Sequence, residues 1–380
     1  MKKILVFIDW YKPGYKAGGP IRSMSNMIGH LSDRYEFYVV TRNTDFLETK
    51  AYLDLEYNKW IKLSENEHVY YISEEKLSIE NIKKLIKTTP FDIAYINGVY
   101  SFYFSILPLF YLNKIKNCQF IVAPRGMFSI QTFKAKALKK RTGILIARFF
   151  GIYKKAIFHV TSTTEKTDIE NLKINPKSIY LVSNLPPILK EQSSNHIEKK
   201  EGELKLVSIA RISNEKNTLF ALQCLQNFKY KGSILFDIFG SIYQKEYWDE
   251  CLEVISKLPG NIKVNYLKEI NNNQVQRIFQ NYHFLFMPSL GENFGHSILE
   301  SFIAGCPVII SNKTPWRNLE EKGLGWDLDL NHPETFANCI QNSIDLNENE
   351  YRKLSKKCKE FSNLIVDNQE IKNKYHQLFG

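Results

Sequence analysis

Two glutamates, Glu292 and Glu300, are the residues of this sequence whose type and spacing best suit chemistry. They stand with seven residues between them in the segment PSLGENFGHSILE. Ionised carboxylates accept hydrogen bonds and repel phosphate, so their natural partners are hydroxyl groups. We therefore expect the pair to hold the hydroxyls of a sugar or a ribose, although two solvated glutamates on a surface loop would show the same spacing.

The elements around this pair are predicted from the pattern of apolar residues. Residues 284–287 and 308–310 are short apolar runs typical of strands, and residues 296–304 suit a helix. Gly305 fits the left-handed residue that ends a helix, and Pro307 cannot continue one. The loop before the helix is thus predicted to open at the carboxyl ends of parallel strands, where the amides of a helix start attract anions.

This segment resembles the donor-sugar signature of the retaining GT-B glycosyltransferases of family 4. The resemblance rests on Glu292 and Glu300, on the Gly-Glu-Asn-Phe-Gly loop and on the Ala-Gly-Cys-Pro-Val run after the helix. It implies two Rossmann-like domains that face each other across a cleft. It also implies that Glu292 is catalytic and holds donor-sugar hydroxyls, that Glu300 holds the ribose, and that the amides of Phe294 and Gly295 hold the phosphate or the sugar.

Two cations, Arg211 and Lys216, follow a predicted strand and match the diphosphate clamp of that family. Fixed cations stabilise the negative charge that builds on a departing diphosphate. A glycine loop containing Gly18 and Gly19 follows the first predicted strand and suits close approach by a phosphate or an acceptor. The same glycines also suit a turn that binds nothing.

Three further residues lie at positions where cleft residues are expected. Asn97 and Arg125 follow predicted strands, at places where related transferases often carry histidine, which puts a general base there in doubt. Arg125 either contacts an anionic group of donor or acceptor or fixes its own loop. His296, at the helix start, is expected to pack or orient the carboxylate loop more than to act on substrate.

The chain is predicted to form an α/β protein of two domains, because strand-like and helix-like segments alternate along its 380 residues. Residues 1–187 and 203–364 are the two predicted domains, with a polar linker between them. The resemblance implies that the first domain binds the acceptor and the second binds the nucleotide sugar. By the resemblance, a last helix at about 365–380 returns to the first domain. The predicted strands of the first domain lie at residues 4–8, 36–41, 69–72, 93–96, 120–123, 157–161 and 179–182.

The net charge of +11 is concentrated in one part of the chain. Residues 93–164 contain no Asp or Glu but eleven Lys and Arg, interleaved with aromatic and aliphatic residues. We expect the basic segment 114–155 to contact an anionic membrane surface, although a solvated helix packed on its own sheet shows the same pattern. Nucleic acid is not expected as a partner, since no binding motif accompanies the charge.

We expect no metal or other cofactor. The Asp327-Leu-Asp329 run resembles an acidic metal motif only superficially, and the six cysteines show no ligand spacing. No secretion signal or membrane-spanning helix is predicted, which favours a cytoplasmic protein, peripheral at the inner face of the plasma membrane.

The resemblance implies transfer of a sugar, with retention, from a nucleotide diphosphate donor to an acceptor hydroxyl. The basic, apolar surface predicted for the N-terminal half suggests a lipid-linked glycan acceptor, as in bacterial capsule or O-antigen assembly. A sugar-nucleotide epimerase or a glycoside phosphorylase with a similar cleft stays open, as does a non-catalytic nucleotide-binding subunit. A hydrolase is disfavoured, because the two glutamates resemble ligand holders and not an acid/base pair.

Overall fold

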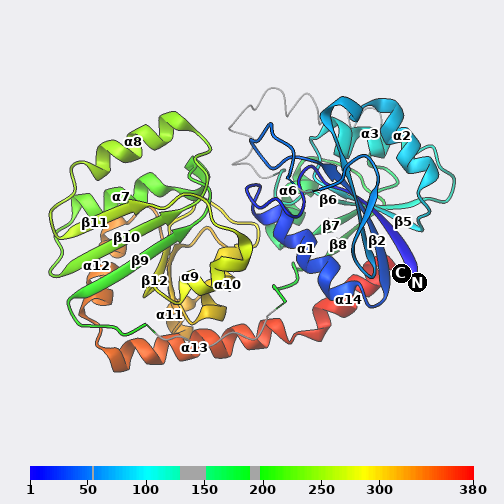
Figure 1. The fold of residues 1–380 in the computed structure, drawn as a ribbon. Helices are drawn as coiled ribbons and strands as arrows, with labels where there is room; N and C mark the ends of the chain where they lie inside the picture. Colours follow the sequence, from blue (N-terminus) through cyan, green and yellow to red (C-terminus); the bar gives the residue numbers. More distant parts are fainter. Residues whose placement is uncertain (54, 129–150, 189–196) are drawn as a thin grey trace. The chain divides into compact units, whose positions relative to one another are not determined.

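A computed structural model describes residues 1–53, 55–128, 151–188 and 197–380 (Figure 1). The chain divides into two compact units, which are described separately. Unit 1 comprises residues 1–188 and 368–380, and unit 2 comprises residues 189–367.

Unit 1 is built on an eight-stranded sheet with the order β3-β4-β2-β1-β5-β6-β7-β8. Its neighbouring strands pair in parallel, except that β3 runs antiparallel to β4. The elements are β1 (Lys2–Phe7), α1 (Gly19–Leu31), β2 (Tyr35–Arg42), β3 (Trp60–Ser64), β4 (Glu67–Ile72), η1 (Glu74–Lys76), α2 (Ile79–Thr88), β5 (Ile93–Asn97), η2 (Phe102–Ile106), α3 (Leu107–Leu112), β6 (Gln119–Ala123), β7 (Ile157–Val160), α6 (Thr163–Asn171), β8 (Ser178–Leu181) and α14 (Gln369–Phe379).

The two faces of this sheet are covered by different helices, so the strands are buried on both sides and read as nearly continuous apolar runs. One core layer joins the sheet to α2, η2, α3 and α6, and the other joins it to α1 and α14. Helix α14 thus contributes Tyr375, Leu378 and Phe379 to the core of unit 1, although it follows unit 2 in the sequence.

Unit 2 has a six-stranded parallel sheet with the order β11-β10-β9-β12-β13-β14. One face packs against α7, α8 and α12, and the other packs against α9, α10 and α13. The elements are β9 (Glu203–Ile209), η3 (Asn214–Lys216), α7 (Thr218–Asn227), β10 (Ser233–Phe239), α8 (Lys245–Ile255), β11 (Ile262–Tyr266), η4 (Asn272–Gln274), α9 (Val275–Phe279), β12 (Phe284–Met287), α10 (His296–Ala304), β13 (Val308–Ser311), α11 (Leu319–Lys322), β14 (Gly325–Leu328), α12 (Pro333–Asp345) and α13 (Glu348–Val366).

Both units therefore have the predicted doubly wound α/β architecture. The helix predicted after the carboxylate loop is α10, with the same bounds, and Gly305 ends it with φ of 77° as expected of a left-handed cap. The strand order reverses between β1 and β5 in the sheet of unit 1 and between β9 and β12 in the sheet of unit 2. Ligands of open α/β sheets bind at the carboxyl ends of the strands beside such a reversal.

Candidate functional site

The strand reversal in unit 2 brings together two loops that are far apart in the sequence. Strand β9 lies beside β12, so the loop that follows β9 runs next to the loop that follows β12. The amide of Leu290 donates a hydrogen bond of 2.9 Å to the carbonyl of Glu215, which joins the two loops directly. The first loop carries Arg211 and Lys216, and the second carries Glu292.

Lys216 and Glu292 form an ion pair across this junction. Lys216 Nζ lies 2.6 Å from Glu292 Oε1, and only 20% of the lysine side chain and 8% of the glutamate side chain are exposed. The hydroxyl of Ser289 donates to the same oxygen at 2.9 Å. Among the described residues no donor contacts Oε2, so this second oxygen is available to the hydroxyl groups of a ligand.

Backbone geometry holds both partners of this ion pair in place. Asn217 adopts a left-handed conformation with φ of 58°, and its side-chain amide donates to the carbonyl of Pro288 at 3.0 Å. Asparagine is one of the few residues that tolerate this conformation. The buried hydroxyl of Ser311 donates to the carbonyl of Ser289. The loop after β9 is therefore bonded to the loop after β12, which is bonded in turn to β13, and these bonds hold Lys216 and Glu292 in place.

The turn before α10 is shaped by Gly295 and Trp316. Gly295 has φ of 77°, and a Cβ atom there would lie 2.9 Å from Ile298 Cδ1 and 3.1 Å from Trp316 Nε1. The indole N–H of Trp316 donates to the carbonyl of Phe294 at 2.6 Å. Ser297, in the first turn of α10, donates to the carbonyl of Ile209 at the end of β9, at 2.7 Å. The start of α10 is thus fixed at the carboxyl end of the sheet.

His296 is the first residue of α10, and its side chain is buried. Its ring lies 4.8 Å from that of Phe294, at an angle of 58°. The ring thus packs against the loop, and a role of His296 in orienting the carboxylates stays a prediction. Glu300 is the fifth residue of the same helix and is partly buried. Helical side chains lean toward the N-terminus of their helix, a direction that would take the Glu300 carboxylate toward the first turn.

Arg211 lies on the loop after β9 and is one-third exposed. Its guanidinium carbon is 5.5 Å from the centre of the Tyr243 ring, and its Nη2 atom is 3.8 Å from Glu215 Oε2. An exposed pair at this distance contributes little to stability. The side chain can therefore leave Glu215 for an anionic ligand at small cost.

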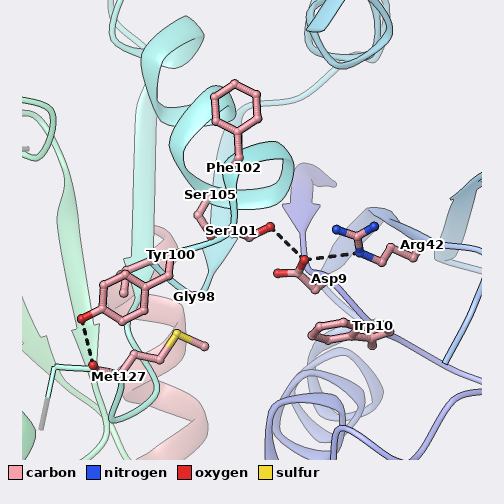
Figure 2. A pocket seen from close by; sticks show the side chains of 10 residues that line it. Asp9, Trp10, Arg42, Gly98, Tyr100, Ser101, Phe102, Ser105 and Met127 are labelled. Carbon is pink, nitrogen blue, oxygen red and sulfur yellow. Dashed lines mark hydrogen bonds and ion pairs between the residues drawn. The ribbon is translucent and has the colours of Figure 1, made fainter. Parts of the chain in front are cut away.

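Unit 1 contains a pocket of about 500 Å³ beside its own strand reversal, which was not predicted from the sequence (Figure 2). Asp9 follows β1, Arg42 ends β2, and the segment from Gly98 to Ser105 follows β5. A volume of this size is typical of sites for small ligands. The sequence signal was a lone aspartate directly after a buried apolar strand.

The polar groups of this pocket converge on Asp9. Asp9 Oδ1 accepts a hydrogen bond of 2.8 Å from Ser101 Oγ and lies 3.5 Å from Arg42 Nε (Figure 2). Burial raises the pKa of the Asp9 carboxyl, and the hydrogen bond from Ser101 and the charge of Arg42 oppose that rise. Ser105 Oγ is fully buried and has no hydrogen-bond partner within the described ranges. A buried hydroxyl without a protein partner beside a pocket is free to bond to a water molecule or to a polar ligand.

Asn97 and Arg125 belong to a hydrogen-bond network inside unit 1. Arg125 Nε donates to Asn97 Oδ1 at 2.8 Å, Nη1 donates to Asn184 Oδ1 at 2.6 Å, and Nη2 donates to the Tyr95 hydroxyl at 2.9 Å. The Tyr95 hydroxyl in turn lies 2.6 Å from His159 Nδ1. These contacts tie Arg125 to the neighbouring strand ends, and its contact with an anionic group of donor or acceptor stays a prediction.

Gly18 and Gly19 belong to unit 1, where Gly18 immediately precedes α1. Gly18 has φ of 71°, and apart from its two chain neighbours no described residue has an atom within 4 Å of the position that a Cβ would take. The glycine at this position is therefore required by backbone conformation and not by close packing. The open space is compatible with a ligand at the start of α1.

The acidic run at the end of β14 has structural partners. Asp327 accepts from the amide of Leu319 at 2.8 Å and pairs with Arg317 at 3.2 Å, and Asp329 accepts from the amide of Asn331 at 2.9 Å. Within the part of the chain that the structure describes, no three His, Cys, Asp or Glu side chains are grouped as metal ligands.

The predicted membrane-binding segment 114–155 lies partly outside the described residues, because these exclude 129–150. The described bases at its ends include Lys114, Lys116, Lys154 and Lys155, which are exposed. No helix in the described ranges combines the length and the apolar character needed to cross a bilayer.

Comparisons with known proteins connect this geometry to a family. Residues 190–361 match the sequence model of the glycosyl transferases group 1. The sequence has no significant match among curated proteins.

Several solved structures share the fold along nearly the whole chain. Anabaena HepE in complex with UDP and glucose has a TM-score of 0.71 at 14% identity, covering 100% of this chain and 99% of its own. A mutant of S. aureus TarM with Fondaparinux, alpha-GlcNAc-glycerol and UDP has a TM-score of 0.66 at 14% identity, covering 100% of both chains. WaaG, a glycosyltransferase involved in lipopolysaccharide biosynthesis, has a TM-score of 0.64 at 11% identity, covering 96% of this chain and 95% of its own. The chain therefore has the GT-B fold of glycosyltransferases, and its residues 190–361 carry the sequence pattern of the glycosyl transferases group 1.

Proposed function

We propose that this protein is a retaining glycosyltransferase of family 4, which moves a sugar from a nucleotide diphosphate donor to a hydroxyl group of a glycan acceptor. The observation that carries the proposal is the contact between Lys216 and Glu292, 2.6 Å apart on the loops that follow β9 and β12. It joins a cation for a diphosphate to a carboxylate for sugar hydroxyls at the strand reversal, inside the region that matches the family.

The donor would bind at this reversal in unit 2. Glu292 would accept hydrogen bonds from the donor sugar through its second oxygen, and Glu300 would accept them from the ribose. The amides of Phe294 and Gly295 would face the phosphate or the sugar, next to the positive end of the α10 dipole. Arg211 and Lys216 would neutralise the diphosphate. HepE was solved with UDP and UDP-glucose, which supports a nucleotide sugar as the donor class.

The chemical step would break the bond between the anomeric carbon of the sugar and the diphosphate oxygen, with the electron pair going to that oxygen. The acceptor oxygen forms its bond to the anomeric carbon on the same face, and its proton goes to the departing phosphate. Charge accumulates on the diphosphate, where Lys216 and Arg211 stabilise it without reorganisation. This scheme uses no metal ion.

The acceptor would bind in the pocket of unit 1. A carboxylate, a guanidinium group, two serine hydroxyls and the Trp10 ring suit a sugar, which presents hydroxyls at its edge and C–H groups on its faces. We propose a lipid-linked glycan as the acceptor, in the assembly of a bacterial capsule or O-antigen. The similarity in fold to WaaG, which acts in lipopolysaccharide biosynthesis, supports this class. The enzyme would work in the cytoplasm, at the inner face of the plasma membrane.

A screen of nucleotide sugars by thermal unfolding tests the donor site. A ligand present at about 100 times its dissociation constant adds about 2.7 kcal/mol to the stability of the form that binds it. The matching donor is then incubated with glycan acceptors, and the anomeric configuration of the product is read by NMR. An inverted product would refute retention, and stabilisation by no nucleotide or nucleotide sugar would refute the donor site.

The same reactions separate the rival functions. An epimerase would convert the donor sugar with no acceptor present, and a phosphorylase would release a sugar phosphate from a glycan with inorganic phosphate alone. A non-catalytic subunit would bind a nucleotide sugar but give no product with any acceptor. The proposed transferase requires both donor and acceptor for turnover.

A further inference from the structure

A row of exposed apolar side chains runs along η2 and α3 in unit 1. We name Phe102, Ile106 and Phe110 the apolar ridge; they are 49%, 38% and 49% exposed. Their spacing of four residues places them on successive turns, and therefore on one face. The opposite face is buried, because Phe104, Leu109 and Leu112 belong to the core of unit 1. The exposure of the ridge is thus not a sign of loose packing.

Single exposed apolar residues need no explanation, but a contiguous row of large ones marks an interaction site. Two phenylalanines and an isoleucine over two helical turns form such a row. Ile115, which is 38% exposed, follows shortly after α3.

Positive charge surrounds the end of the apolar ridge. Lys114 Nζ lies 3.9 Å from the centre of the Phe110 ring, and Lys83 Nζ of the neighbouring helix α2 lies 5.9 Å from the Tyr111 ring. Lys155 Nζ donates to the carbonyl of Asn113 at 3.0 Å. Helix α2 carries three lysines, of which Lys83 is the first, and a single acid, Glu80. The sequence between residues 93 and 164 contributes no acid at all.

We infer that the apolar ridge and its flanking lysines dock unit 1 on a bilayer of anionic lipid. Aromatic and aliphatic side chains insert into the boundary between headgroups and acyl chains, and lysines at their edge pair with anionic headgroups. A surface on which lysines outnumber acids beside an apolar row fits an anionic membrane better than it fits a protein partner, whose contact surface would carry the two signs in closer balance.

The position of Phe102 supports a membrane as the partner of the apolar ridge. Phe102 begins the apolar ridge and also lines the pocket that contains Asp9, as Figure 2 shows. A glycan attached to a lipid could therefore enter the pocket while its lipid stays in the bilayer. This last step rests on the proposed function, whereas docking on the membrane does not.

Sedimentation with vesicles tests the inference on the full chain. Vesicles of phosphatidylcholine mixed with phosphatidylglycerol are expected to bind the protein, and vesicles of phosphatidylcholine alone are expected to bind it much less. The double variant Ile106→Ser/Phe110→Ser is expected to bind the anionic vesicles about tenfold more weakly or less, since it removes two inserting side chains. Lys114→Glu is expected to weaken binding by about fivefold or more.

The matched control is Leu252→Ser/Leu364→Ser, which removes two apolar residues of unit 2 that are 45% and 74% exposed. This control is expected to bind like the wild type. Thermal unfolding of all variants, with and without the donor nucleotide sugar, checks that both folding and the donor site survive. Donor binding with no vesicle binding would overturn the membrane inference and leave the proposed function intact.

Two other outcomes would also overturn the inference. Equal binding by the ridge variant and the wild type would show that the apolar ridge does not insert. Self-association of the wild type that the ridge variant abolishes, without any vesicle binding, would assign the ridge to an interface between protein chains.

Discussion

The ion pair between Lys216 and Glu292 can be tested by a double-mutant cycle of Lys216→Met and Glu292→Gln. At a charge separation of about 4 Å and an effective dielectric constant of about 20, the attraction is about 4 kcal/mol. Desolvation of two largely buried groups offsets part of it, so we expect a coupling free energy of about 1.5–3 kcal/mol. Lys216→Met should destabilise unit 2 more than Glu292→Gln does, because it leaves an unpaired carboxylate that is only 8% exposed.

Hydrogen exchange of buried amides in β9 measures the stability of unit 2 separately, which matters because two units need not unfold in one transition. The control cycle is Lys257→Met with Glu253→Gln on the surface of unit 2. That pair has the same separation of 2.6 Å, but its side chains are 59% and 69% exposed. Its coupling should be far smaller than that of the Lys216–Glu292 pair, because solvent screens charges that are this exposed.

The same variants test the role of the lysine in catalysis. If Lys216 stabilises the departing diphosphate, Lys216→Met should lower kcat by about 10²–10³, the usual effect of removing one group that stabilises developing charge. The control variant Lys257→Met should keep full activity. Additive stability effects in the Lys216 cycle, or full turnover by Lys216→Met, would refute the reasoning.

Three further predictions concern other parts of the molecule. Asp9→Asn should raise KM for the acceptor and leave donor affinity unchanged, which steady-state kinetics with each substrate varied in turn can check; an effect on donor affinity alone would contradict it. Gly295→Ala should lower stability by about 1–3 kcal/mol in thermal unfolding, because of its φ of 77° and the contact of 2.9 Å with Ile298; an unchanged unfolding temperature would disprove the strain. Burial lowers the pKa of His159 to about 3 and that of His283 to about 4, so only the unfolded chain takes up these protons below about pH 6.5. The stabilisation by each neutral histidine is then complete above that pH, and it falls as the pH drops toward the folded pKa values, by about 2 kcal/mol for each histidine at pH 5. Urea titrations at several pH values measure the slope of the unfolding free energy against pH. His159→Gln should reduce this slope by nearly one proton, and an unchanged slope would count against the buried neutral ring.

The strands that line the core were predictable, because buried parallel strands are apolar along their whole length. The predicted strand over 93–96 corresponds to β5 and that over 284–287 to β12. Strand β3 was not predicted. Its sequence, Trp-Ile-Lys-Leu-Ser, is partly exposed at the antiparallel edge of the sheet and shows neither a continuous apolar run nor a clean alternation.

The candidate site also has parts that were predicted from the sequence and parts that were not. Lys216 and Glu292 were paired in the sequence analysis only because a family resemblance related them, and the strand order supplies the physical reason for their contact. The pocket of unit 1 was missed, because Ser101 is 92 positions from Asp9 and reaches it only through the pairing of β1 with β5. The partners of Arg125 could not be predicted either. Arg125 follows β6 and Asn184 follows β8, so their contact depends on the pairing of β6, β7 and β8 in the sheet.

The return of α14 to unit 1 has a consequence for biosynthesis. Tyr375, Leu378 and Phe379 are at most 1% exposed, so the apolar layer that they complete stays open until the ribosome has translated all of the intervening unit. Unit 2 is made from a single uninterrupted stretch of the chain, so it can fold before α14 has been synthesised and has completed the apolar layer of unit 1. In a nascent chain stalled before residue 368, unit 2 would therefore be folded, whereas unit 1 would still expose an apolar face that chaperones can bind.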